Sequence, residues 1–298
     1  MTTGKPLTTP PTNLKEAIDW VLRVSGGDGY GGSDVIELVE ALKERDVINV
    51  DNLYNDLQSH INTLANALKN FIGYAPSGTS GSDFKIDIGG NGIIKPGEIY
   101  SKTQPISENK IYTSAYKGSW FTDVNVGYPQ NPTETEITCA RIFFTAIRLI
   151  YEGLTELYYN CKKEWSSQSL SGSGHSDTLN QFMTTNGFSG TQLNTSMKGD
   201  IIASQSLQDF NEFTTAYTAA GDNPSLDVFR SQLEQNASTS PSNYPLSTLY
   251  ILATYAYVQS TSPGTPSFAG YSGLTALAGG AYGFNLGGLG TFVSALLA

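Results

Sequence analysis

Basic residues and cysteines are scarce in this chain of 298 residues. Seventeen Lys and Arg stand against 27 Asp and Glu, so the net charge is -10 and the isoelectric point lies near 4.6. The basic residues form no cluster that would neutralise phosphates, which excludes a nucleic-acid-binding protein and disfavours an anionic lipid surface. Two cysteines, Cys139 and Cys161, are too few for a disulfide framework.

Charge is also missing from the C-terminal quarter, because residues 235–298 contain no Asp, Glu, Lys or Arg. This segment is long enough to span a membrane. Three features argue against a span: Asn285, the glycine breaks and the lack of flanking basic residues. We therefore expect a buried or partner-covered, glycine-rich terminal segment. At the other end, residues 1–12 are polar and rich in Thr and Pro, so we expect a mobile tail without a standard signal peptide.

Apolar residues recur at helical spacing in three long segments. Thr12 and Asn13 are suitable N-cap residues for the first helix. The apolar residues expected on the three buried faces are Leu14, Ala17, Ile18, Val21 and Leu22; then Val50, Leu57, Ile61, Leu64, Leu68 and Phe71; then Ile137, Ala140, Phe144, Ile147, Tyr151, Leu154, Tyr158, Cys161 and Trp165. Shorter helices are expected around 176–185, 205–220 and 225–236. The pattern predicts a mainly α fold, a helical bundle built on long antiparallel helices.

The third of these segments, 137–165, also decides how the cysteines can pair. A continuous helix places Cys139 and Cys161 about 33 Å apart at 1.5 Å per residue. That distance is far beyond the limit of about 7 Å between the Cα atoms of a disulfide. The two cysteines therefore cannot pair with each other.

Residues 73–132 form a long, irregular insertion between two predicted helices within a single, mainly helical domain of residues 13–298. The insertion is rich in Gly, Ser, Pro, Tyr and Asn and contains short β-prone stretches. An excursion of this length is usually functional or disordered. Four aromatic residues in it are candidates for receptor contact, the alternative being that they fasten the loop to the bundle: Tyr116, Trp120, Phe121 and Tyr128.

Three patterns resemble sites of known chemistry without meeting their requirements. Gly27, Gly29 and Gly32 have the dinucleotide-binding spacing, but a helix precedes them where a strand is required, so we interpret them as a helix-to-helix linker. Residues 87–98 imitate a calcium loop, with Asp87, Asn91 and Glu98 as weak candidate ligands. Position 3 of that loop is a glycine and neither flank is helical, so a glycine turn between short strands is preferred.

No other pattern points to catalysis. His60 and His175 lack zinc-ligand partners at the usual spacing, and the chain has no nucleophile elbow. We expect no enzyme, no cofactor and no metal. The sequence leaves open whether Asn194 and Asn236 are glycosylated.

Several segments resemble the variant erythrocyte surface antigens of babesial red-cell parasites. These segments are 11–26, 137–162, 179–194, 244–259 and 273–298, beginning with PTNLKEAIDWVLRVSG and ending with GLTALAGGAYGFNLGGLGTFVSALLA. The resemblance implies a large, antigenically variable protein that is exported to the surface of the infected red cell. It also implies cytoadhesion, immune evasion and a membrane anchor beyond this chain.

The resulting hypothesis is a non-catalytic ectodomain whose helices support a variable, receptor-binding surface. The expected partner is a host cell-surface protein, either an endothelial adhesion molecule or an immune receptor. The alternative is an assembly module that packs against the rest of a longer antigen, or against a second antigen chain, through its uncharged C-terminal quarter.

Overall fold

The computed structural model describes residues 5–26, 38, 51–72, 114–116, 134–170, 178–188 and 193–261. Within these ranges the fold is mainly helical, as the sequence predicted, and the bridges Lys5–Tyr116 and Ser169–Lys198 are isolated β-bridges. In chain order the elements are α1 (Leu14–Val24), α3 (Asp51–Phe71), α4 (Glu134–Cys161), α5 (Leu179–Thr185), α6 (Gly199–Ile201), the π-helix η1 (Ile202–Ser206), α7 (Asn211–Ala219), α8 (Leu226–Thr239), the 3-10 helix η2 (Pro241–Asn243) and α9 (Pro245–Thr261).

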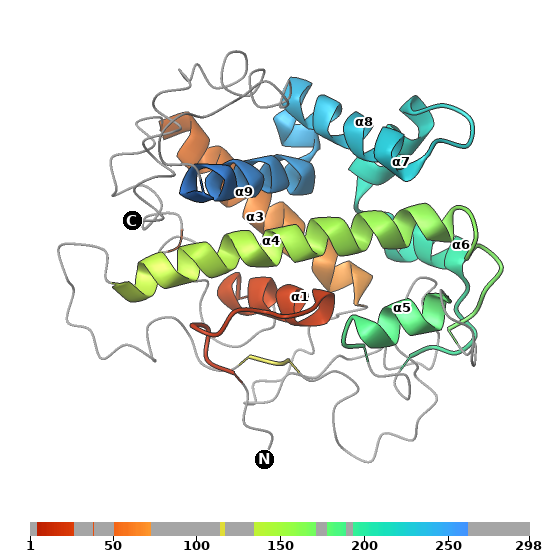
Figure 1. The fold of residues 1–298 in the computed structure, drawn as a ribbon, viewed down its shortest axis with the longest axis horizontal. Coiled ribbons are helices and arrows are strands. Elements are labelled where there is room, and N and C mark those ends of the chain that lie inside the picture. The colour runs from red at the N-terminus through yellow and green to blue at the C-terminus, as the bar shows by residue number, and fades with distance from the viewer. Residues whose placement is uncertain are drawn as a thin grey trace.

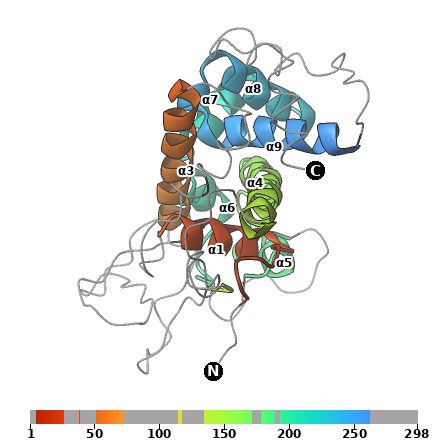
Figure 2. The ribbon, with the colours of Figure 1, turned by 90° about the vertical axis from the view of Figure 1, so that its left-hand side faces the viewer.

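Helix α4 is the central element of the fold. It runs through the middle of the molecule, with α1 on one side and α9 on the other (Figure 1). Figure 2 shows α4 nearly end-on, whereas α3 and α9 run across the view, so both of these helices cross the direction of α4. Helix α3 contacts both α1 and α9 and so spans the two layers that enclose α4.

Burial of α4 extends beyond the predicted apolar face. Every member of that face whose side chain is described is buried, and so are Ile142, Phe143, Ala146, Ile150 and Leu157 on other sides of the helix. Helices pack against more than one side of α4, which explains why its apolar residues are not confined to a single stripe.

The predicted long helix ends earlier than its pattern suggests. Residues 137–165 were expected to be one helix, but α4 ends at Cys161 and Trp165 lies in the turn that follows. The Trp165 backbone N–H donates to the carbonyl oxygen of Asn160 at 2.8 Å. Trp165 is nevertheless buried, with its ring centroid 5.3 Å from that of Phe182 in α5. The apolar spacing therefore predicted the burial of Trp165 correctly, although this residue lies beyond the end of the helix.

Both cysteines are buried in α4 and are not paired with each other, as predicted. Burial raises the pKa of the Cys161 thiol, with a further contribution from the charge of Asp200. A thiol in this state is a poor nucleophile because the reactive form is the thiolate. Cys161 is therefore a core residue in the described part of the chain.

The N-terminal residues 5–12, the described part of the predicted tail 1–12, lie against α1. Leu7 is 2% exposed, and its carbonyl oxygen accepts a hydrogen bond of 2.9 Å from the Trp20 indole. Lys5 forms an ion pair with Glu16. The polar composition of the segment concealed one buried leucine and several backbone bonds that hold it on α1.

Several predicted features lie outside the described residues. They are the glycines at 27, 29 and 32, the calcium candidates Asp87, Asn91 and Glu98, the aromatic residues Trp120, Phe121 and Tyr128, and the terminal segment 262–298. Of the helix after the glycine linker, only Leu38 is described, and it is helical and buried. Among the described residues, no helix combines the length and the apolar character needed to cross a membrane.

Candidate functional site

Residues 114–116, the described part of the long insertion, dock on one side of α1. The Ala115 backbone N–H donates to the Asp19 carboxylate at 2.8 Å, and the Arg23 guanidinium donates to the Tyr116 carbonyl oxygen at 2.8 Å. Both α1 side chains are buried, and they lie one helical turn apart. The Lys5 backbone N–H donates to the Ala115 carbonyl oxygen at 2.8 Å, so three segments meet here.

Tyr116 is the one receptor-contact candidate among the described residues, and its side chain is 1% exposed. Its hydroxyl group donates to the Thr9 carbonyl oxygen at 3.0 Å. Burial, with smaller contributions from the negative charges of Glu16 and Asp19, raises the pKa of this phenol above its usual range. This placement favours the alternative reading for Tyr116, in which it fastens the insertion to the helices.

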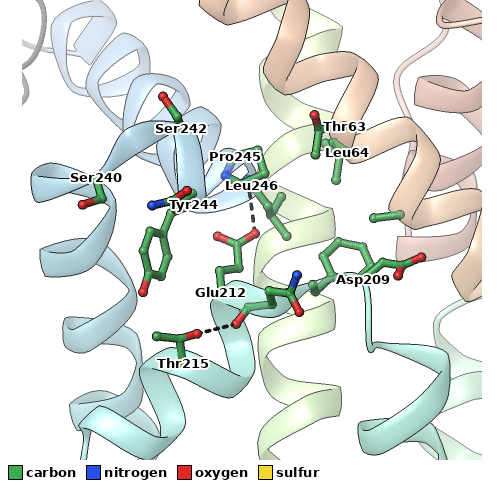
Figure 3. A pocket seen from close by; sticks show the side chains of 14 residues that line it. Thr63, Leu64, Asp209, Glu212, Thr215, Ser240, Ser242, Tyr244, Pro245 and Leu246 are labelled. Atoms are coloured by element: carbon green, nitrogen blue, oxygen red, sulfur yellow. Dashed lines mark hydrogen bonds between the residues drawn. The ribbon is translucent and has the colours of Figure 1, made fainter.

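A second feature is a cavity of about 480 Å³ between α3, the start of α7 and the segment that leads into α9 (Figure 3). Six of the lining residues are exposed and form the rim through which the cavity meets solvent: Thr63, Asp209, Asn211, Thr215, Ser242 and Asn243. The other lining residues are Leu64, Ala67, Phe210, Glu212, Ser240, Tyr244, Pro245 and Leu246.

Glu212, on the inner wall of this cavity, is 2% exposed and caps helix α9 from a distant part of the chain. One carboxylate oxygen, Oε1, accepts from the Leu246 backbone N–H at 3.2 Å. The other, Oε2, accepts from the Ser247 backbone N–H at 3.1 Å and from the Ser247 hydroxyl at 2.7 Å. Figure 3 shows the carboxylate directed at the start of α9, beside Tyr244 and Pro245.

These bonds help to explain how the first backbone N–H groups of α9 find hydrogen-bond acceptors. The N-terminal N–H groups of a helix have no partner within it. Pro245 has no N–H, Leu246 and Ser247 donate to Glu212, and the Thr248 N–H donates to the Tyr244 carbonyl oxygen at 2.9 Å. A carboxylate at this position also interacts favourably with the helix dipole. Glu212 thus performs for α9 the role that a local N-cap side chain usually performs.

The electrostatics of the cavity are dominated by two carboxylates. Glu212 lies on the inner wall and Asp209 on the rim, where Asp209 accepts a hydrogen bond from the Asn70 amide. No Lys, Arg or His is among the lining residues. Burial raises the pKa of Glu212 to about 7, although the hydrogen bonds from Ser247 and Leu246 partly offset this effect.

Aromatic contacts hold the surrounding helices in place. The rings of Tyr151 in α4 and Tyr250 in α9 stack at a centroid separation of 3.8 Å. The Tyr158 ring of α4 lies 5.4 Å from that of Phe213 and 5.8 Å from that of Phe229, which joins α4 to α7 and α8. These contacts fix the positions of α7 and α9, the two elements that Glu212 links.

Sequence reasoning did not identify Glu212 as a site residue. It lies in the first turn of α7, where an acidic residue is ordinarily a solvated, dipole-stabilising group. The sequence does contain one indication, at the start of α9. Tyr244 precedes Pro245 at the N-cap position, where Ser, Thr, Asp or Asn is usual. A helix start without a local acceptor needs one from elsewhere, but the sequence does not say which carboxylate supplies it.

The described residues provide no group of three or more His, Cys, Asp or Glu arranged to hold a metal ion. Their most developed features are a helical scaffold, a fastened loop segment and an open, acidic cavity. These features define a mainly helical protein region.

Comparison with known families gives one match. A model of the variant erythrocyte surface antigen-1 family matches residues 98–243, just under half of the chain. This match supports the family that the resemblance predicted; it names no organism, so the babesial source stays a prediction. No curated protein and no solved structure matches the chain.

Proposed function

We propose that this chain is a receptor-binding region of a variant antigen displayed on the infected red cell. Its match to a surface antigen family supports display at a surface. In this proposal the protein is exported, is held by a membrane anchor outside this chain, and acts by binding without catalysis. Cytoadhesion and immune evasion then follow from the same contact with a host cell-surface protein, either endothelial or immune.

The observation that carries the proposal is the attachment of residues 114–116 to α1. Asp19 and Arg23 bind backbone groups of this segment, and the buried Tyr116 side chain adds a hydrogen bond to Thr9, so 114–116 forms a short fixed attachment within the insertion. A loop fastened through its backbone can change sequence on either side of the attachment at little cost to the core. This arrangement suits an antigen that must vary its surface while keeping its fold.

The experiment is a binding screen of the full chain against a library of host ectodomains, followed by loop replacement. Residues 73–113 and 117–132 are replaced by Gly-Ser linkers while 114–116 is kept, so that the contacts to α1 remain. We expect binding to be lost and the melting temperature to change little. A matched control replaces 171–177 with a Gly-Ser linker of equal length and should keep binding.

Two results would oppose this assignment of the binding surface. Binding that survives both replacements would remove the insertion from the contact. A stable dimer in a solution mass measurement, with no host ectodomain bound, would favour the alternative role as an assembly module. The described start of the uncharged quarter is already buried within its own chain, at Leu246, Leu249 and Ile251, and so offers little bare surface for such a role.

A further inference from the structure

The cavity beside α9 has the properties of a ligand site that the proposed receptor binding does not use. Its volume of about 480 Å³ falls within the range of small-molecule pockets, about 300–1,000 Å³. Its rim is exposed, so a ligand can enter from solvent. Its lining combines polar side chains with two rings, those of Phe210 and Tyr244, and with the apolar residues Leu64, Ala67, Pro245 and Leu246.

Charge decides which ligand chemistry fits. Asp209 and Glu212 are the ionisable carboxylates of the lining, and neither forms an ion pair with a basic side chain in the described part of the chain. The hydrogen-bond donors they meet there are neutral: the Asn70 amide for Asp209, and two backbone N–H groups and a hydroxyl for Glu212. An anionic ligand would be repelled by this pair, whereas a cation would supply the missing positive charge.

Glu212 also has acceptor capacity to spare. A carboxylate offers about four acceptor positions, and three are occupied, one on Oε1 and two on Oε2. The remaining position lies on Oε1. A charged N–H donor placed there would form a charge-assisted hydrogen bond in a partly desolvated setting.

We propose that this cavity binds an ammonium or guanidinium group, with Glu212 as its charge partner inside and Asp209 at the rim. The aromatic faces of Phe210 and Tyr244 are suited to the same type of group through cation–π contact. Such a group is carried either by a small organic cation or by a Lys or Arg side chain of a protein partner. The inference rests on the cavity alone and stands independently of the loop-mediated receptor binding.

The test uses the full chain and probes that differ only in charge. N-acetyl-arginine amide is titrated by calorimetry or by NMR, with N-acetyl-citrulline amide as the neutral counterpart of nearly the same shape. For a ligand of this size we expect a Kd of about 1 mM or tighter. The citrulline compound should bind at least about fivefold more weakly, because it lacks the charge.

Variants locate the site. Asp209→Asn should weaken binding about two- to fivefold, as expected for an exposed ion pair. Glu212→Gln should weaken it about tenfold or more, because the inner charge is desolvated. The control Asp222→Asn removes an exposed carboxylate that does not line the cavity and should leave the Kd unchanged. If Glu212→Gln fails to fold, Thr63→Trp, which covers the rim from α3, must abolish binding instead.

A second arm separates the two sources of the cation. A short peptide with one central Arg is compared with the free arginine derivative and with its citrulline counterpart. Peptide binding at least tenfold tighter supports a protein partner, and equal binding supports a small molecule; both keep the assigned chemistry. The proposal is overturned by an absence of saturable binding, by equal affinity for the citrulline probe, or by equal effects of Asp209→Asn and Asp222→Asn.

Discussion

Glu212 is expected to make the stability of this protein fall as the pH rises from acid to neutral. Burial raises the pKa of its carboxyl group from 4.5 to about 7 in the folded state, against the opposing hydrogen bonds from Ser247 and Leu246. A raised folded-state pKa means that the folded protein holds this proton more tightly than the unfolded chain does. The contribution is therefore complete below about pH 4.5 and is lost as the pH rises through about 7.

The magnitude follows from the difference between the two pKa values. A pKa raised from 4.5 to about 7 corresponds to about 3 kcal/mol, most of which is lost between pH 5 and pH 8. This is a large share of the free energy of unfolding of an ordinary domain, about 5–15 kcal/mol. The effect should therefore be visible without special conditions.

The assay is urea unfolding of the natural chain and of Glu212→Gln at pH 5, 6, 7 and 8. Glutamine keeps the size of the side chain and one carbonyl acceptor for the start of α9, but it does not titrate. Other ionisable groups, including Glu234, whose pKa is also raised by burial, are present in both proteins. The difference between the two unfolding free energies therefore isolates Glu212.

We expect this difference, natural chain minus variant, to fall by about 2–3 kcal/mol across that pH range. Asp222→Asn, at an exposed position, serves as the control for the removal of one carboxylate from the chain. A Glu212→Gln difference that stays flat within about 0.5 kcal/mol, or that rises with pH, would refute the reasoning from burial.

Three further predictions concern packing and reactivity. Gly199→Ala should destabilise the protein by about 2 kcal/mol or more in thermal or urea unfolding, because the new Cβ would lie 2.2 Å from the Trp165 carbonyl oxygen. The control Gly221→Ala places its Cβ in open space but at a φ of +92°, so it should cost only about 1–2 kcal/mol. Tyr151→Phe should change the unfolding free energy by less than about 1 kcal/mol, or should stabilise, because the buried hydroxyl it removes has no hydrogen-bond partner among the described residues. Cys161 should react with a thiol reagent only after unfolding, as followed by mass spectrometry, since burial raises the pKa of its thiol.

Local spacing was sufficient to predict the helices whose apolar residues form one continuous face. The side chain of Asn13 accepts from the Glu16 N–H and caps α1, as the sequence indicated, and Leu57 and Leu68 of α3 are buried as expected. Gly26, with a φ of 65°, ends the first helix at the point where the glycines predicted an end. These features depend on residues within a few turns of one another, which is why the sequence reveals them.

Features that depend on contacts between distant segments were not predictable in the same way. Asp19 and Arg23 occupy the polar positions of α1 and are buried because residues near 5 and 115 cover them. Glu212 meets its partners 34 and 35 positions further along the chain. A polar residue on a helix is predicted to be solvated unless the segment that covers it is known. These sites can therefore be identified only once the fold is known.

The lack of charge in the C-terminal quarter is connected with the burial of Glu212. Helix α9 carries no charge of its own and has no local side-chain cap, so its first N–H groups depend on a carboxylate supplied by α7. That carboxylate has a raised pKa because it is buried, although its hydrogen bonds to the start of α9 partly offset the effect. A cation held in the adjacent cavity would favour the ionised form, so its binding would oppose the loss of stability that rising pH produces. The pH-dependent stability and the cation binding proposed for Glu212 therefore both depend on whether this one carboxyl group is protonated.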